Sequence, residues 1–467
     1  MADSEAVIRL YRSEDKIHPR AVDGFYARWR WAFVALTQLV FYGLPWLGWG
    51  QRQAVLFDLE ARRFYVFGLV LYPQDFVYLT ALLMISAFGL FLFTAVAGRL
   101  WCGYACPQTV YTEIFMRVER WFEGDRNARL RLDRSRWGWD KLWRKAGKQL
   151  VWIALGLWTG FTFVGYFTPI HTLAIEVASL ALGPWESFWV LFYGFATYGN
   201  AGYMREQVCK YMCPYARFQS AMFDRDTLIV SYDPARGEPR GNNALRKKGE
   251  ARAAAVGDCI DCELCVQVCP TGIDIRKGLQ YECIGCAACI DVCNGVMDKM
   301  GTARGLIRYD TENGLAQRLG RAQRWRRVLR PRVLIYTAVL LAICAALLWS
   351  LASRHSFRVD VVRDRVALAR LVEDGWVENV YRLQIMNATE EKQSYRLEAD
   401  GLPGLKLVQT SPIGIGAAEA RWVAVALRMP PEAARALKAG AHPLRWRVKR
   451  EAGDETVTEK STFVVPR

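Results

Sequence analysis

Long apolar stretches alternate with polar and basic ones along this chain of 467 residues. Five of them are apolar for about 20 residues, which is the length that a helix needs to cross the hydrocarbon core of a bilayer. They lie at 31–49, 76–97, 150–167, 187–203 and 333–352. The pattern therefore predicts an α-helical membrane bundle with about five spans.

The tail after residue 354 has a different period. Apolar and polar residues alternate at 377–386, 394–398, 421–429 and 443–449, with turn residues between these segments. A period of two is typical of strands that bury one face. We expect the tail to form a small β-sandwich.

Basic residues set the expected orientation in the membrane. Lys and Arg are concentrated at 117–148 and at 318–332, whereas 168–186 contains neither. Because basic loops stay on the cytoplasmic side, we expect a bacterial inner-membrane protein with its N-terminus in the cytoplasm and its tail in the periplasm. The net charge of +16 fits this topology. No nucleic-acid motif accompanies the charge, so nucleic acid is not an expected partner.

Twelve of the thirteen cysteines fall into three sets. Two sets share the spacing C-x2-C-x2-C-x3-C of bacterial ferredoxins with two [4Fe–4S] clusters, in which the fourth cysteine of each run ligates the other cluster. The predicted ligands are Cys259, Cys262, Cys265 and Cys293 for one cluster, and Cys283, Cys286, Cys289 and Cys269 for the other. Structural zinc is the alternative, but zinc ribbons usually offer two CxxC pairs. Cluster thiolates also imply a reducing compartment.

The third set consists of two CxxxCP motifs, one after the second apolar stretch and one after the fourth. Their cysteines are Cys102, Cys106, Cys209 and Cys213. The i,i+4 spacing predicts that both thiols of a motif lie on one helix face. Soft thiolates favour Cu(I), zinc or an iron–sulfur cluster. The alternative is that these are buried structural cysteines at helix ends.

Other electron-transfer groups lack their motifs in this sequence. None of the four histidines lies in the middle of an apolar stretch, which excludes a bis-histidine haem between spans. There is no glycine-rich phosphate loop or nucleotide fingerprint. A nicotinamide bound by this chain is therefore not the expected electron donor, and the cytoplasmic donor is not identified by the sequence.

In combination, these motifs resemble those of the FixG/RdxA/CcoG family of cytochrome c oxidase accessory proteins. The likeness rests on KIHPR (16–20), RFYVFGL (63–69), YPQDF (72–76), AGRLWCGYACPQTV (97–110), RWFEGDR (120–126) and the dicluster run. It extends over nearly the whole chain, including an outer immunoglobulin-like tail.

The resemblance implies a cupric reductase that converts Cu(II) to Cu(I) for the copper–haem centre of a cbb3-type oxidase. The two clusters would then supply electrons, and the CxxxCP cysteines would be the copper-facing thiols. The implied partners are the lipid bilayer, oxidase subunits, and copper chaperones or transporters. Two other functions fit the sequence, namely an electron carrier to a quinone or redox partner and a non-catalytic scaffold for oxidase assembly.

We therefore expect a multi-domain membrane protein with five parts. They are a cytoplasmic segment (1–28), a four-span membrane domain (29–215), a cytoplasmic dicluster ferredoxin-like domain (216–332), a fifth span (333–353) and a periplasmic immunoglobulin-like β-sandwich (354–467).

Overall fold

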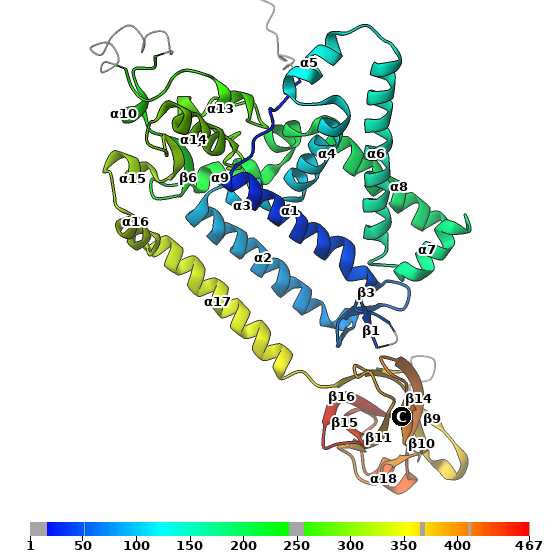
Figure 1. Ribbon diagram of the computed structural model, residues 1–467. Coiled ribbons are helices and arrows are strands. Elements are labelled where there is room, and N and C mark those ends of the chain that lie inside the picture. The colour runs from blue at the N-terminus through cyan, green and yellow to red at the C-terminus, as the bar shows by residue number, and fades with distance from the viewer. Residues whose placement is uncertain (1–15, 51, 242–255, 365–368, 410–411, 467) are drawn as a thin grey trace, which may run out of the picture. The chain divides into compact units, whose positions relative to one another are not determined.

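The computed structural model describes residues 16–50, 52–241, 256–364, 369–409 and 412–466. The chain divides into two compact units (Figure 1). One comprises Met1–Leu47 and Leu82–Ile343, and the other comprises Gly48–Ala81 and Cys344–Arg467. Two helices, α2 (Phe76–Ala97) and α17 (Pro331–Ala352), each begin in one unit and end in the other.

All five predicted segments are helical, the second with the expected bounds and the other four with shifted ones. The first corresponds to α1 (Phe25–Gly43), the third to α6 (Trp139–Val164), and the fourth to α8 (Pro184–Tyr198) with a following π-helical turn (Gly199–Met204). Among the described residues, two helices are long and apolar enough to cross a membrane, Pro73–Ala97 and Pro331–Ala352. The apolar part of α6 is short because its first turns are charged, and α8 is interrupted at Gly199.

Glycines bring α6 and α8 into close contact. A Cβ atom at Gly156 would lie 2.7 Å from the Gly194 carbonyl oxygen, and one at Gly160 would lie 2.2 Å from the Val190 carbonyl oxygen. Helices associate closely inside membranes through small residues of this kind.

Other helices of this unit are α3 (Leu100–Tyr104), α4 (Pro107–Glu123), α5 (Arg126–Arg134), α7 (Ile170–Ala178), α9 (Pro214–Met222), α10 (Pro234–Gly237), α15 (Glu312–Ala316) and α16 (Arg321–Val328).

The ferredoxin segment folds in the same unit. It contains α13 (Leu264–Gln267) and α14 (Ala288–Met300), beside a sheet in which β6 (Ile229–Tyr232) pairs antiparallel with β7 (Ile307–Asp310). The first turn of α1 is attached to α14, because the Asp291 carboxylate accepts hydrogen bonds from the backbone N–H groups of Tyr26 (3.1 Å) and Ala27 (2.7 Å). The first helix and the ferredoxin segment are therefore parts of one packed body.

The tail forms the predicted β-sandwich. One sheet has the order β12-β14-β10-β8 with β9 beside β10, and the other has the order β13-β11-β15-β16. Tyr381 of β10 and Trp446 of β15 are fully buried between them, with ring centroids 5.2 Å apart. The strands are β8 (Phe357–Arg363), β9 (Arg370–Leu371), β10 (Val377–Asn387), β11 (Gln393–Asp400), β12 (Lys406–Leu407), β13 (Ile413–Ile415), β14 (Ala420–Met429), β15 (Gly440–Arg450) and β16 (Thr456–Val465), and a short helix α18 spans Pro431–Arg435.

The segment between the first two spans belongs to the unit of the sandwich, which the pattern of the sequence did not predict. After a short ribbon of β1 (Gly48–Trp49) and β2 (Arg52–Gln53), it forms an antiparallel meander of β3 (Val55–Asp58), β4 (Arg63–Val66) and β5 (Leu69–Leu71). Leu56, Tyr65 and Val70 of the meander share a core with Met386. The Tyr72 hydroxyl donates to the Asn387 carbonyl at 2.8 Å.

A buried carboxylate fixes the entry to α2 against the tail. Asp75 is 3 % exposed and accepts a hydrogen bond from the Tyr72 N–H at 3.0 Å. Arg354 lies 2.7 Å from its Oδ2 atom, and Arg358 lies 3.0 Å from Oδ1. A carboxylate this deeply buried requires such partners, because its desolvation is costly.

We expect Asp75→Asn to destabilise this unit by about 3–5 kcal/mol, because it leaves the buried Arg354 without a counter-ion. Thermal unfolding of the full chain in detergent, followed by near-UV circular dichroism, measures the change. The control is Asp454→Asn, whose side chain is fully exposed beside Lys449 and should change stability by less than about 1 kcal/mol. Equal stability of the two variants would contradict the role given to Asp75.

Candidate functional site

The first predicted ligand set gathers around a small cavity. Cys259, Cys262, Cys265 and Cys293 all line it, with Cys293 contributed by α14. The loop around the first three cysteines turns through left-handed residues at Asp261 (φ 52°) and Glu263 (φ 56°). Cys259 and Cys265 are buried, whereas Cys262 is exposed.

The second set lines another cavity in the same way. Cys269, Cys283, Cys286 and Cys289 surround it, together with Cys265 from the first set. Its loop repeats the left-handed turns at the equivalent positions, Gly285 (φ 67°) and Ala287 (φ 59°). In each cavity the fourth cysteine of one run therefore lies with the first three of the other run.

The residues of both cavities fit iron–sulfur clusters. Among the described residues, no three His, Cys, Asp or Glu side chains converge on a single-ion site. A [4Fe–4S] cluster does not require such convergence, since each thiolate binds a different iron atom. Burial raises the pKa of Cys265 to about 11 and that of Cys283 to about 12, so the thiolate forms need the positive charge of iron. The assignment of individual cysteines to a cluster stays a prediction.

The CxxxCP motifs do not form continuous helices, and the prediction that both thiols of a motif lie on one helix face is wrong. Cys102 lies in α3, but Cys106 has extended backbone (ψ 128°) before Pro107 begins α4. Cys209 lies in a π-helical turn (Val208–Met212), and Cys213 is extended (ψ 109°) before Pro214 begins α9. The physical reason is the proline, whose ring disfavours helical backbone at the preceding residue.

The four CxxxCP thiols nevertheless lie in one region. Burial, together with the electrostatic influence of Cys106, Cys102 and Cys213, raises the pKa of Cys209 to about 12. Burial also raises the pKa of Cys102 to about 11, although its thiol donates to the Gln219 side-chain oxygen at 3.4 Å. The structure thus groups the two motifs without bringing their thiols to a single point.

The first CxxxCP motif packs directly on the loop of the second cluster cavity. A Cβ atom at Gly103 would lie 2.8 Å from the Cys286 Cα atom, and one at Gly285 would lie 3.0 Å from the Arg99 carbonyl oxygen. Glycine at both positions allows the two backbones to touch. Nothing in the cysteine spacing indicates this contact.

Three side-chain donors hold the same loop. Arg30 donates to the Cys286 carbonyl at 2.7 Å, Arg99 to the Cys283 carbonyl at 3.3 Å, and the Tyr309 hydroxyl to the Gly285 carbonyl at 2.5 Å. Arg99 also donates to the Ala216 carbonyl, in the helix that follows the second motif. Arg99 therefore links the second cavity with both CxxxCP motifs.

A buried carboxylate connects the helices that flank the motifs. Glu119 of α4 is completely buried and lies 2.9 Å from Arg205, just before the second motif. It is surrounded by four cations in all: Arg129 (2.8 Å), Arg205, Lys148 (3.6 Å) and Lys16 (3.8 Å). Burial alone would raise the pKa of Glu119, but these cations hold it at about 2.

We expect Gly103→Ala to displace the Cys286 loop, because the new methyl group would overlap its backbone. The iron content should then fall from about eight atoms per chain towards about four, with loss of one of two cluster signals in EPR spectra. Gly295→Ala is the matched control, since a Cβ atom there meets nothing within 4 Å. Unchanged iron and spectra in Gly103→Ala would rule out a tight contact.

We expect Glu119→Gln to lower the stability of the first unit by about 3–5 kcal/mol, since it removes the carboxylate that these four cations share. In the wild type, a pKa lowered from 4.5 to about 2 means that this stabilisation is present above pH 4.5 and is lost as the pH falls towards 2. Thermal unfolding as a function of pH tests both points. The exposed Asp140→Asn change, which affects an i,i+4 pair with Arg144, should have little effect.

Three family models match this chain. A model described as a 4Fe-4S dicluster domain matches residues 204–312, and a model described as a 4Fe-4S binding domain matches residues 79–128. The tail, residues 347–466, matches the IG-like fold at the C-terminus of FixG. The first two matches include all twelve cysteines of the three sets, and the third confirms the immunoglobulin-like character of the sandwich.

Curated relatives are similar over most of the chain. Nitrogen fixation protein FixG of Rhizobium meliloti is 41% identical over 425 residues, which cover 84% of this chain and 81% of that protein. Protein RdxB of Cereibacter sphaeroides is 42% identical over 406 residues (85% and 84%), and protein RdxA of the same organism is 38% identical over 407 residues (85% of each). With iron–sulfur domains, apolar helices long enough to cross a membrane and these relatives, the chain belongs to the FixG/RdxA family of membrane-associated electron-transfer proteins.

Proposed function

We propose that this protein is a cupric reductase of the bacterial inner membrane, which supplies Cu(I) for the maturation of a cbb3-type oxidase. The observation that carries the proposal is the contact between Gly103 of the first CxxxCP motif and the Cys286 loop of the second cluster cavity. It supports the proposal, because a cluster held in that cavity would be an electron source directly beside a group of soft ligands. Oxidase subunits, and copper chaperones or transporters, are the partners that this function requires.

The chain path supports the expected topology. Residues 48–81 and the tail share one unit, as expected for segments on the same side of a membrane. The ferredoxin segment packs with α1 through Asp291 and with the end of α2, where Arg330 donates to the Ala95 carbonyl. Together with the positive-inside rule, these contacts favour five spans, with the clusters in the cytoplasm and the sandwich in the periplasm.

Each group of residues has a distinct role in this proposal. The eight ferredoxin cysteines hold two clusters, which when bound supply single electrons at low potential. The four CxxxCP thiols bind copper as substrate, and because thiolates prefer Cu(I) to Cu(II), they make the reduction more favourable. Burial raises the pKa of Cys102 and Cys209, and the charge of the nearby Arg99 offsets part of this rise. The reaction is Cu(II) plus one electron to give Cu(I).

A second candidate function rests on one of the family matches. The 4Fe-4S binding model over residues 79–128 includes Cys102 and Cys106. If the CxxxCP thiols hold a further cluster instead of copper, the protein is an electron carrier to a quinone or another redox partner.

The deciding experiment is copper reduction by the pre-reduced protein without added reductant. The wild type should yield about two Cu(I) per chain, one electron from each cluster, detected with a Cu(I)-specific chelator. Cys102→Ala with Cys209→Ala should abolish the yield while the two ferredoxin signals remain in EPR spectra. Cys344→Ala, which changes the one cysteine outside the three sets, is the control.

Undiminished Cu(I) production in the double variant would contradict the copper assignment. Iron well above about eight atoms per chain, falling in the double variant, would establish the further cluster and favour the carrier function.

A further inference from the structure

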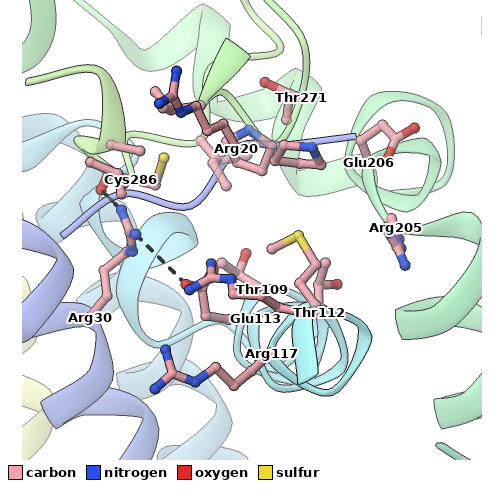
Figure 2. A pocket seen from close by; sticks show the side chains of 18 of the residues that line it. Arg20, Arg30, Thr109, Thr112, Glu113, Arg117, Arg205, Glu206, Thr271 and Cys286 are labelled. Atoms are coloured by element: carbon pink, nitrogen blue, oxygen red, sulfur yellow. Dashed lines mark hydrogen bonds and ion pairs between the residues drawn. The ribbon is translucent and has the colours of Figure 1, made fainter. Parts of the chain in front are cut away.

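A basic pocket lies between the two redox elements of the first unit. Its walls come from the N-terminal segment, from α4, from the turn that contains Arg205 and Cys209, and from the second ferredoxin run at Cys286. Its cavity volume is about 70 Å³, which is room for a small group of a few heavy atoms. Figure 2 shows Arg30 directed towards Cys286 and Glu113, with Arg20 and Arg117 on different sides of the space. Cys209 is the one CxxxCP thiol in its lining, and the proposed copper chemistry uses none of its arginines.

The lining carries an excess of positive charge. Three carboxylates, Asp23, Glu113 and Glu206, lie among six arginines: Arg20, Arg30, Arg117, Arg120, Arg129 and Arg205. Half of these arginines are neutralised within the protein. Arg30 lies 3.7 Å from Glu113, and Arg129 and Arg205 both pair with Glu119.

The other three arginines, Arg20, Arg117 and Arg120, have no acidic partner within 4 Å among the residues that the structure describes. The Arg117 guanidinium lies 5.4 Å from the centre of the Trp31 ring, which restricts its orientation. Like charges in one concave surface repel one another, and they attract anions to it. The pocket is therefore built for a ligand of negative charge.

The buried arginines of the pocket are a second, independent indication that it binds an anion. The Nε atoms of Arg30 and Arg129 and the Nη1 atom of Arg205 are buried without a hydrogen-bond acceptor in the protein, and all three residues line the pocket. Arg30 and Arg205 are only 6 % and 5 % exposed. A buried N–H group without an acceptor is costly, so a ligand that brings several oxygen atoms would stabilise this wall.

We propose that this pocket binds a small oxyanion, a phosphate or carboxylate group, through Arg20, Arg117 and Arg120. The planar guanidinium group donates two parallel hydrogen bonds to such groups, which makes arginine the preferred residue for them. An apolar ligand such as a quinone ring would have to bury the three unpaired charges and is disfavoured. The proposal does not depend on copper chemistry.

The location beside Cys286 gives the bound anion an effect on the second cluster. Arg30 donates to the Cys286 carbonyl, so the pocket wall and the cluster loop are in direct contact. A negative charge placed there opposes the addition of an electron nearby. Anion binding should therefore lower the reduction potential of the second cluster and leave that of the first nearly unchanged.

The test is isothermal titration calorimetry of the full holoprotein in non-ionic detergent at constant ionic strength. Separate titrations use inorganic phosphate and citrate, and a third arm uses nanodiscs with and without phosphatidylglycerol, which offers the same group on a lipid. We expect saturable binding that weakens about tenfold or more in Arg117→Gln with Arg120→Gln, because two charge-assisted contacts are lost. Arg20→Gln, a change at an exposed side chain, should weaken binding as well.

The charge-matched control is Arg134→Gln with Arg136→Gln, two exposed arginines outside the pocket. It should bind as tightly as the wild type. Saturable binding in the phosphatidylglycerol arm alone, lost in the pocket variant, identifies the oxyanion as a lipid headgroup.

The proposal is overturned if none of the three probes binds, or if the pocket and control variants bind equally well. A redox titration provides the second readout. A fall in the potential of one cluster on saturation with the bound anion supports the site, and equal potentials with and without it contradict the position beside Cys286.

Discussion

The contact of two backbones at Gly103 and Gly285 is the constraint on which the arrangement of the first unit depends. No side chain separates the CxxxCP motif from the loop of the second cluster cavity there, because a Cβ atom on either glycine would meet the opposite backbone at about 3 Å or less. Electron transfer is favoured by short distances, and glycine at both positions lets these two backbones touch. The hydrogen bonds from Arg30, Arg99 and Tyr309 then have the task of keeping the loop in place.

In each unit, a buried ion cluster holds together segments that lie far apart in the sequence. Glu119 of α4 pairs with cations from the N-terminal segment, α5, α6 and the turn before the second CxxxCP motif, and Asp75 pairs with two arginines from the start of the tail. Apolar packing alone would allow these segments to shift relative to one another, particularly where one side of a helix faces lipid. A buried charge has few acceptable positions, so each cluster specifies a geometry as well as an energy.

Sequence reasoning was strongest where spacing itself carries the chemistry. The eight ferredoxin cysteines lie around two cavities in the predicted sets, and strands β10, β11, β14 and β15 occur where the period of two predicted them. It missed β8, although Phe357, Val359 and Val361 alternate there with polar residues, and β16, in which charged and threonine residues obscure the alternation. The resemblance to the FixG/RdxA family is confirmed by the relatives.

Sequence reasoning failed where contacts between distant segments, or local steric clashes, determine the structure. The i,i+4 rule assumed a continuous helix through each CxxxCP motif, but Pro107 and Pro214 force the preceding cysteines into extended backbone. The attachment of residues 48–81 to the tail depends on contacts such as Tyr72 with Asn387, more than 300 positions apart. No local pattern encodes such a pairing.

The left-handed turns of the two ferredoxin runs bear on the direction in which electrons pass between the clusters. They recur at equivalent positions, Asp261 and Glu263 in the first run and Gly285 and Ala287 in the second, so the two loops are nearly copies of one another. Two nearly identical loops do not by themselves determine which cluster receives electrons and which cluster passes them on. The difference lies in what surrounds them, because Cys262 is open to solvent whereas the second loop is covered by Gly103 and Arg99. The two loops are alike, so the direction of electron transfer depends on the different residues that surround them.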